Sequence, residues 1–158
     1  MDYRSLLSEN SFTVSTAESC TGGNIAHEIT RESGSSEYFI GSVVSYSNQV
    51  KEDVLGVSNH ALMEFGAVSE IVAKEMADGA RRVMQTDYAI STTGIAGPTG
   101  GSNEKPVGTV WIGIASESVV YALKHVFSGD RVAVINQATE KALELLLKEL
   151  KKDLKKSK

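Results

Sequence analysis

Segments with strand character alternate with segments of helical periodicity along this chain, and this order limits the possible folds more than any other feature. Run 107–115 is almost entirely apolar, as expected for a strand that is covered on both faces. Only three residues separate it from the next strand, which favours a hairpin. The sequence therefore predicts an α/β fold, a three-layer α/β/α sandwich with a mixed, mostly parallel sheet. The expected strands are 12–17, 37–46, 87–93, 107–115 and 119–126, and the expected helices are 2–9, 23–33, 49–55, 70–84 (with Ser69 as N-cap) and a long closing helix from about residue 130.

Length and composition are those of one globular domain. The chain has 158 residues, of which 41% are hydrophobic and 23% charged, so we expect a single domain over residues 1–158. It has no run of about 18 apolar residues and no signal-peptide core at its N-terminus, so we expect no membrane partner. Cys20 is the single cysteine, which excludes an internal disulfide and fits a reducing, cytoplasmic location.

Charge is unevenly distributed along the sequence. The last eight residues, 151–158, contain five lysines and one aspartate, and since the whole chain carries −4, residues 1–150 carry −8. The basic end continues a helical pattern and lacks interleaved aromatic residues, which favours a solvated helix end over a nucleic-acid site. The acidic body also argues against nucleic acid as a partner.

A polar block, Thr16–Gly23, follows the first predicted strand directly and lies on the turn into the next helix. The first N–H groups of a helix lack intrahelical partners, so this turn is expected to offer a site for an anion or a developing oxyanion. Ser19 and Cys20 stand side by side in the block and indicate a nucleophile. Cys20 is the rival to Ser19, although a lone cytoplasmic cysteine is most often a small buried apolar residue.

A second block, Thr92–Gly101, lies at the end of the predicted strand 87–93 and contains four glycines and a proline between residues 94 and 101. It matches neither a Walker A loop nor a dinucleotide-binding fingerprint. It is either a wide turn or a loop whose backbone approaches a ligand closely. Both polar blocks follow the ends of predicted parallel strands, where open α/β sheets bind ligands, and this position favours the second interpretation.

A third block contains Tyr46 and Lys51, again at the end of a strand. The three histidines are scattered and form neither a triad nor a zinc-binding pattern, so we expect no metal and no cofactor. A serine nucleophile without histidine can use a lysine as its base. The pKa of a free lysine is near 10.4, and burial must lower it toward about 7 to 8 for that role at neutral pH. Ser19 and Lys51 would form such a dyad, with the Tyr46 hydroxyl as a proton relay.

The block Phe127–Arg131 opens the last predicted helix. Arg131 can hold a phosphate or carboxylate of a ligand. It can equally pair with Asp130 or another surface carboxylate, and spacing alone leaves both alternatives open.

Taken together, these blocks resemble the CinA C-terminal domain family, the nicotinamide mononucleotide amidohydrolases, in a stand-alone form. The resemblance implies a three-layer α/β/α fold and hydrolysis of a nucleotide carboxamide to nicotinate mononucleotide and ammonia in pyridine nucleotide salvage. It also implies a homo-oligomer. The residues that carry it are Thr16–Gly23, Gly34–Ser36, Tyr46–Asn48 with Lys51, Gly66–Ser69, Thr93–Pro98, Lys105–Val110 and Phe127–Arg131.

The resemblance points to Ser19 as nucleophile, with Lys51 and Tyr46 as base and relay, and Thr93 and Arg131 fall on positions similar to substrate contacts of the family. The alternative is a non-catalytic module that senses a nucleotide or phosphate, in which Ser19 caps a helix instead of attacking a substrate. The residues that we expect to bind substrate are Thr21, Gly22, Gly23, Asn48, Thr93, Gly94, Gly97 and Arg131.

Overall fold

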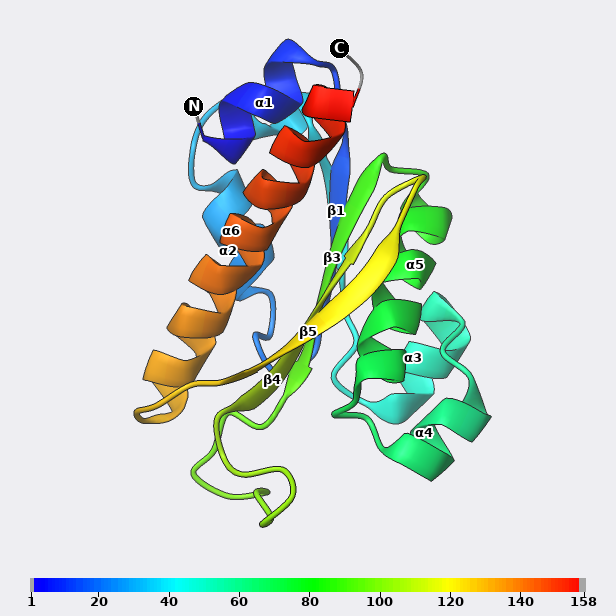
Figure 1. Ribbon diagram of the computed structural model, residues 1–158, viewed down its shortest axis with the longest axis vertical. Helices are drawn as coiled ribbons and strands as arrows, with labels where there is room; N and C mark the ends of the chain where they lie inside the picture. Colours follow the sequence, from blue (N-terminus) through cyan, green and yellow to red (C-terminus); the bar gives the residue numbers. More distant parts are fainter. Residues whose placement is uncertain (1, 157–158) are drawn as a thin grey trace.

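The computed structural model describes residues 2–156 (Figure 1). Met1 and the last two residues of the basic C-terminal segment lie outside the described residues. The elements follow in the order α1 (Tyr3–Glu9), β1 (Val14–Glu18), α2 (Asn24–Thr30), a 3-10 helix η1 (Ser35–Glu37), β2 (Phe39–Val44), α3 (Asn48–Leu55), α4 (Asn59–Phe65), α5 (Glu70–Met84), β3 (Tyr88–Gly94), β4 (Thr109–Ala115), β5 (Val120–Val126) and α6 (Arg131–Lys156).

The strands form one five-stranded sheet in the order β2-β1-β3-β4-β5. Strand β1 pairs in parallel with β2 and β3, whereas β3 with β4 and β4 with β5 are antiparallel. The α/β class and the mixed sheet are thus confirmed, but only two of the four pairs are parallel, so parallel pairing does not predominate as expected. The reason is the connection 95–108, which contains no helix and therefore cannot return the chain for a parallel neighbour.

Helices α1, α2 and α6 lie on one side of the sheet, and α3, α4 and α5 lie on the other (Figure 1). Side chains alternate between the two faces of each strand, so one strand contributes to both cores. The core under α1, α2 and α6 takes the larger strand residues Val14, Ile90, Ile112 and Ile114. The core under α5 takes the smaller residues Ala17, Ala89 and Ala115, which allow that helix to lie close to the sheet.

Serine side chains cap the N-termini of α3, α4 and α5. The Ser69 hydroxyl accepts a hydrogen bond from the Val72 N–H at 3.4 Å, as predicted, and the Ser47 hydroxyl accepts from the Val50 N–H at 3.2 Å at the start of α3. Helix α4 was not predicted, because its buried residues Ala61 and Leu62 are adjacent and its apolar Met63 and Phe65 are exposed, so the apolar positions show no helical period. Its signal is the cap itself: the Ser58 hydroxyl accepts from the Ala61 N–H at 3.1 Å.

No helix within residues 2–156 is both long enough and apolar enough to cross a membrane.

Helix α5 packs tightly against the end of α3 at Gly79. A Cβ atom there would overlap the carbonyl oxygen of Leu55 and lie 2.9 Å from its carbonyl carbon. Helix propensity alone favours Gly79→Ala by about 1 kcal/mol, but overpacking against backbone costs about 1–3 kcal/mol or more. We expect Gly79→Ala to lower the free energy of unfolding by about 2 kcal/mol, as measured by urea denaturation.

Gly41→Ala is the matched control, because its new Cβ would meet only the flexible end of Met84 at 3.3 Å. That variant should change the free energy of unfolding by less than about 1 kcal/mol. A Gly79→Ala protein more stable than wild type would contradict the packing described here.

Candidate active site

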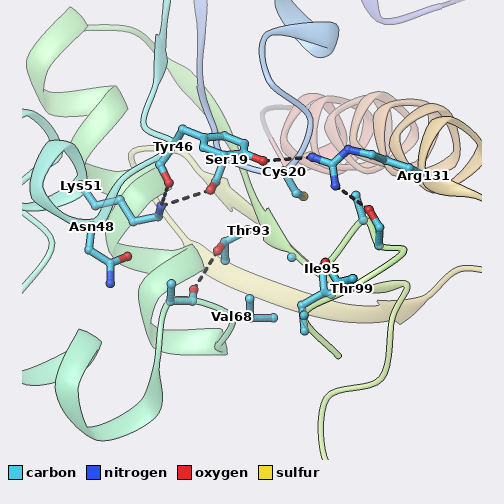
Figure 2. Close-up of a pocket in the computed structure, with 15 residues that line it drawn as sticks. Ser19, Cys20, Tyr46, Asn48, Lys51, Val68, Thr93, Ile95, Thr99 and Arg131 are labelled. Carbon is cyan, nitrogen blue, oxygen red and sulfur yellow. Dashed lines mark hydrogen bonds between the residues drawn. The ribbon is translucent and has the colours of Figure 1, made fainter. Parts of the chain in front are cut away.

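A cavity of about 300 Å³ opens where the carboxyl ends of β1 and β3 meet the segment after β2 (Figure 2). This is the edge of the sheet at which ligands bind in open α/β folds. Its walls come from the ends of β1 and β3, the start of α3, the α4–α5 connection, the loop after β3 and the start of α6. The lining residues are Ser19, Cys20, Tyr46, Asn48, Lys51, Ala67, Val68, Thr93, Gly94, Ile95, Ala96, Gly97, Thr99, Gly100 and Arg131.

Eight of the residues predicted for the site line this cavity: Ser19, Tyr46, Asn48, Lys51, Thr93, Gly94, Gly97 and Arg131. Thr21, Gly22 and Gly23 do not. Thr21 is buried with its hydroxyl 2.7 Å from both the Glu18 carboxylate and the Thr92 hydroxyl. The Gly22 N–H donates to the Ser19 carbonyl at 3.0 Å, and Gly23 is the N-cap of α2.

Ser19 and Lys51 are in direct contact. Ser19 follows the last residue of β1, and its N–H donates to the Thr92 carbonyl at 3.0 Å. Lys51 lies on α3 with 1% of its surface exposed, and its Nζ is 3.1 Å from Ser19 Oγ. Figure 2 shows the two side chains pointing toward each other. The fold therefore brings together two residues that are 32 positions apart in the sequence.

The surroundings of the Lys51 amine favour its neutral form. Burial lowers its pKa below the ordinary value of 10.5, and the smaller influence of Cys20 acts the other way. The amine donates to the Ser45 carbonyl at 2.7 Å and lies 3.5 Å from the Tyr46 carbonyl. In the described part of the chain, Lys51 forms no ion pair with a carboxylate that would hold the proton on it.

Tyr46 and Arg131 meet on the other side of the cavity. The Arg131 guanidinium donates to the Tyr46 hydroxyl at 3.0 Å and to the Gly97 carbonyl at 2.6 Å. Asp130 instead caps α6 by accepting from the Ala133 N–H at 2.9 Å, so it is not a partner of Arg131. Since Lys51 contacts Ser19 directly, proton transfer between them needs no relay. The relay through Tyr46 stays a prediction.

Cys20 lies on the turn after β1, and its side chain packs in the core under α1, α2 and α6, whereas Ser19 contacts Lys51 on α3. Its side chain is buried among residues that pack under α1, α2 and α6, although it also touches the cavity. Burial raises the pKa of the thiol to about 12. A thiol with that pKa is almost fully protonated at neutral pH and is a poor nucleophile.

The N-terminus of α2, predicted as a site for a ligand anion, is occupied by the chain itself. The Glu18 carboxylate is fully buried and accepts from the N–H groups of Ile25 and Ala26, both at 2.9 Å. A carboxylate satisfies these free N–H groups as a bound anion would. The prediction of a ligand anion at these N–H groups was wrong, because the side chain of the residue before Ser19 folds back onto them.

Two side chains that flank the glycine-rich loop donate hydrogen bonds to backbone carbonyls at the end of α4 and in the α4–α5 connection. The Thr93 hydroxyl donates to the Ala67 carbonyl at 2.8 Å, and the Lys105 amine donates to the Phe65 carbonyl at 2.7 Å. Gly97 has a φ of +85°, and a Cβ on it would overlap the Val107 side chain, so glycine is required there. Ala67 and Val68 also line the cavity, but their apolar side chains carry no chemical signal, so the sequence did not predict them as site residues although they lie in the block 66–69.

Comparisons with known proteins show which family this chain is similar to. A family model described as the CinA C-terminal domain matches residues 2–150. A nicotinamide-nucleotide amidohydrolase, PncC, of Shigella flexneri is 52% identical over 137 residues, which are 85% of this chain and 82% of that protein. A CinA-like protein of Salinibacter ruber is 56% identical over 119 residues, which are 75% of this chain and 29% of that protein.

Solved structures of the same superfamily are similar over almost the whole chain. A CinA superfamily protein of Enterobacter cloacae has a TM-score of 0.89 and 34% identity, with 93% of this chain and 87% of that one covered. A competence/damage inducible protein of Agrobacterium tumefaciens has a TM-score of 0.87 and 39% identity, with 94% and 92% covered. The chain spans only 29% to 36% of the length of the CinA-like and competence-damage inducible relatives that it matches.

Burial of Cys20 can be tested directly, because it is the only cysteine. With 7% of its surface exposed and its pKa raised to about 12, the thiol should react with a disulfide reagent such as DTNB at least about 100-fold more slowly in the folded protein than in guanidinium chloride. Absorbance of the released thionitrobenzoate gives both rates. Equal rates in the two states would contradict the burial described here.

Proposed function

This chain belongs to the CinA C-terminal domain family, and from the geometry of its cavity we propose that it hydrolyses the carboxamide of nicotinamide mononucleotide to nicotinate mononucleotide and ammonia. The observation that carries the proposal is the buried Lys51 amine 3.1 Å from the Ser19 hydroxyl in a cavity. The choice of substrate rests on the name of the relative from Shigella flexneri. The proposal includes a single amidohydrolase domain in a three-layer α/β/α arrangement that acts as a homo-oligomer in the cytoplasm, in pyridine nucleotide salvage.

The neutral Lys51 amine is the general base. Its two N–H groups can face the carbonyl oxygens of Ser45 and Tyr46, which leaves its lone pair toward the Ser19 hydroxyl. The amine takes the Ser19 proton while Oγ attacks the carboxamide carbon, and the carbonyl π electrons move to the oxygen. The positive charge of the substrate's pyridinium ring makes that carbon more electrophilic.

Collapse of the tetrahedral intermediate breaks the C–N bond. The Lys51 ammonium returns its proton to the leaving nitrogen, which departs as ammonia and leaves an ester on Ser19. Water then attacks the ester carbon and gives a proton to Lys51. That proton passes to Ser19 Oγ as the C–O bond breaks, so the enzyme regains its starting state and nicotinate mononucleotide is released.

The developing oxyanion requires N–H donors near Ser19. The Ser19 N–H already donates to Thr92, and the Gly22 N–H already donates to Ser19. The Cys20 N–H has no partner from another residue in the range 2–156, and it belongs to the residue next to the nucleophile. We assign it as an oxyanion donor, a role whose loss typically costs about 3 kcal/mol of transition-state stabilisation.

Arg131 is the proposed phosphate partner. Among the described residues that line the cavity, Lys51 and Arg131 are the basic ones, and Lys51 is engaged with Ser19. Arg131 is exposed, so a phosphate bound to it remains near solvent while the carboxamide reaches the buried Ser19. Its guanidinium holds the Gly97 carbonyl in the glycine-rich loop, whose backbone can take part in the same contact.

The alternative, a nucleotide- or phosphate-sensing module without catalysis, would use the free N-terminus of α2. Glu18 occupies that position. Anion sensing also gives no reason to bury a lysine amine against a serine hydroxyl, because burial disfavours its charged form. The enzyme is therefore the better-supported function.

Ammonia release from nicotinamide mononucleotide by wild type, Ser19→Ala and Cys20→Ala, without added metal, tests the proposal. We expect wild type and Cys20→Ala to release ammonia, and Ser19→Ala to lose at least about 1000-fold in kcat because the nucleophile is gone. Loss confined to Cys20→Ala would move the nucleophile by one residue. A folded wild type that releases no ammonia would reject this substrate.

The pH dependence of kcat/KM tests the role of Lys51. Only the neutral amine accepts a proton, so activity should rise with pH up to the lowered pKa of Lys51, below 10.5, and fall about tenfold per pH unit under it. Lys51→Arg should abolish activity, since a guanidinium stays protonated in this range. Lys148→Met, an exposed lysine on α6, is the control and should keep the wild-type profile. An unchanged profile in Lys51→Arg would exclude Lys51 as the base.

A further inference from the structure

Glu18 is the most completely buried carboxylate next to the cavity, and the mechanism above does not use it. Its side chain has 0% exposure, and it forms no ion pair with a basic side chain among residues 2–156. Burying a carboxylate without a cation is costly unless hydrogen bonds compensate. The hydrogen bonds that compensate for the burial of Glu18 also fix the chain segment to which they connect it.

Both carboxylate oxygens of Glu18 accept from the segment that follows Ser19. One oxygen accepts from the Thr21 hydroxyl at 2.7 Å and the Ile25 N–H at 2.9 Å, and the other accepts from the Ala26 N–H at 2.9 Å. The side chain therefore ties residues 21, 25 and 26 back to residue 18. Ser19 lies between Glu18 and these partners, directly after Glu18.

The Glu18 backbone is connected to Lys51 through Ser45. Its carbonyl oxygen accepts from the Ser45 N–H at 2.9 Å, and the Ser45 carbonyl in turn accepts from the Lys51 amine at 2.7 Å. One oxygen of the Glu18 carboxylate also lies 3.5 Å from the Ser42 hydroxyl on β2. Glu18 thus links the turn that carries Ser19 to the strand whose end holds Lys51.

We propose that Glu18 is a positioning residue for the Ser19–Lys51 pair: its buried carboxylate holds the turn that carries Ser19 in a single conformation relative to the Lys51 amine. This inference rests on the proposed function, in which the 3.1 Å contact between the two residues performs the chemistry. A misplacement of reacting groups by about 1 Å can cost on the order of 100-fold in rate.

The carboxylate is required because it only accepts hydrogen bonds. Each of its oxygens faces a backbone N–H of α2, from Ile25 on one side and Ala26 on the other. The amide of Glu18→Gln would have to turn its NH₂ group toward one of these donors in either orientation. The variant keeps the size of the side chain and should disturb only the turn that it anchors.

The experiment compares Glu18→Gln with Glu149→Gln in ammonia release from nicotinamide mononucleotide, with thermal unfolding measured in parallel. Glu149 is the matched control, since it is also a buried carboxylate, 2% exposed, but bonds to Lys152 at 3.1 Å on α6 and does not line the cavity. We expect Glu18→Gln to lose at least about tenfold in kcat with KM within about threefold of wild type. Glu149→Gln should lose melting temperature and keep its kcat. Wild-type kcat in a folded Glu18→Gln protein would overturn the inference.

If Glu18→Gln does not fold, the Thr21 hydroxyl gives the same test more mildly. Thr21→Val has the same shape without the hydroxyl, and Thr21→Ser keeps the hydroxyl. Reduced kcat in Thr21→Val, recovered in Thr21→Ser, supports the inference. Equal wild-type kcat in both variants overturns it.

Labelling of Ser19 by a fluorophosphonate, located by peptide mass spectrometry, separates this inference from the choice of substrate. A wild type that labels at Ser19 but releases no ammonia rejects the substrate alone. In that case Glu18→Gln should still label at least about tenfold more slowly than Glu149→Gln. Equal labelling rates would overturn the positioning role, and a wild type without label at Ser19 and without turnover would reject the proposed function and the inference that rests on it.

Discussion

Burial of the Lys51 amine against the Ser19 hydroxyl is the interaction on which the rest of the site depends. A lysine that is 1% exposed and has no carboxylate partner in the described structure has a lowered pKa, which favours the neutral form that the proposed general base requires. The amine keeps backbone carbonyl partners, which satisfy its N–H groups without holding an extra proton by opposite charge. In the proposed mechanism, the buried lysine takes the place of the histidine base of Ser-His-Asp enzymes.

The position of β1 in the sheet explains why Ser19 and Lys51 meet while the Cys20 side chain lies in a core. Strand β1 lies between β2 and β3, so the residue at its end faces the segments that follow both neighbours. On the bend and turn that follow β1, Ser19 faces α3 and Cys20 faces the core under α2 and α6. The small strand residues under α5 let that helix lie close to the sheet, and Gly79 on α5 lets the end of α3, the helix that carries Lys51, pack against α5.

Sequence patterns predicted most of this arrangement where the signal was local. The order of strands and helices, the Ser69 cap and the grouping of polar blocks at strand ends could all be seen from periodicity and turn residues. Three features of the structure could not be predicted from such local patterns. The apolar residues of α4 follow no helical period, and the pairing of β4 depends on the absence of a crossover helix in a long loop.

The third feature is the fate of the α2 N-terminus, which sequence analysis left open to a ligand. Whether a preceding carboxylate folds back onto those N–H groups depends on side-chain direction, which Thr16–Gly23 does not encode in any simple pattern. For the same reason the sequence placed Thr21 among the substrate-binding residues, whereas its hydroxyl forms hydrogen bonds with the Glu18 carboxylate and the Thr92 hydroxyl. Polar residues in a functional block thus divide into those that face the cavity and those that hold its walls, and only the structure separates them.

The most direct test of this account is a double-mutant cycle on kcat/KM for ammonia release, with Ser19→Ala, Lys51→Met and the two combined. Residues that act as one unit lose their contribution once either is removed, so we expect the double variant to be no more than about threefold slower than the slower single variant. Losses that multiply would mean that Ser19 and Lys51 act independently, and would contradict the claim that their contact is the catalytic unit.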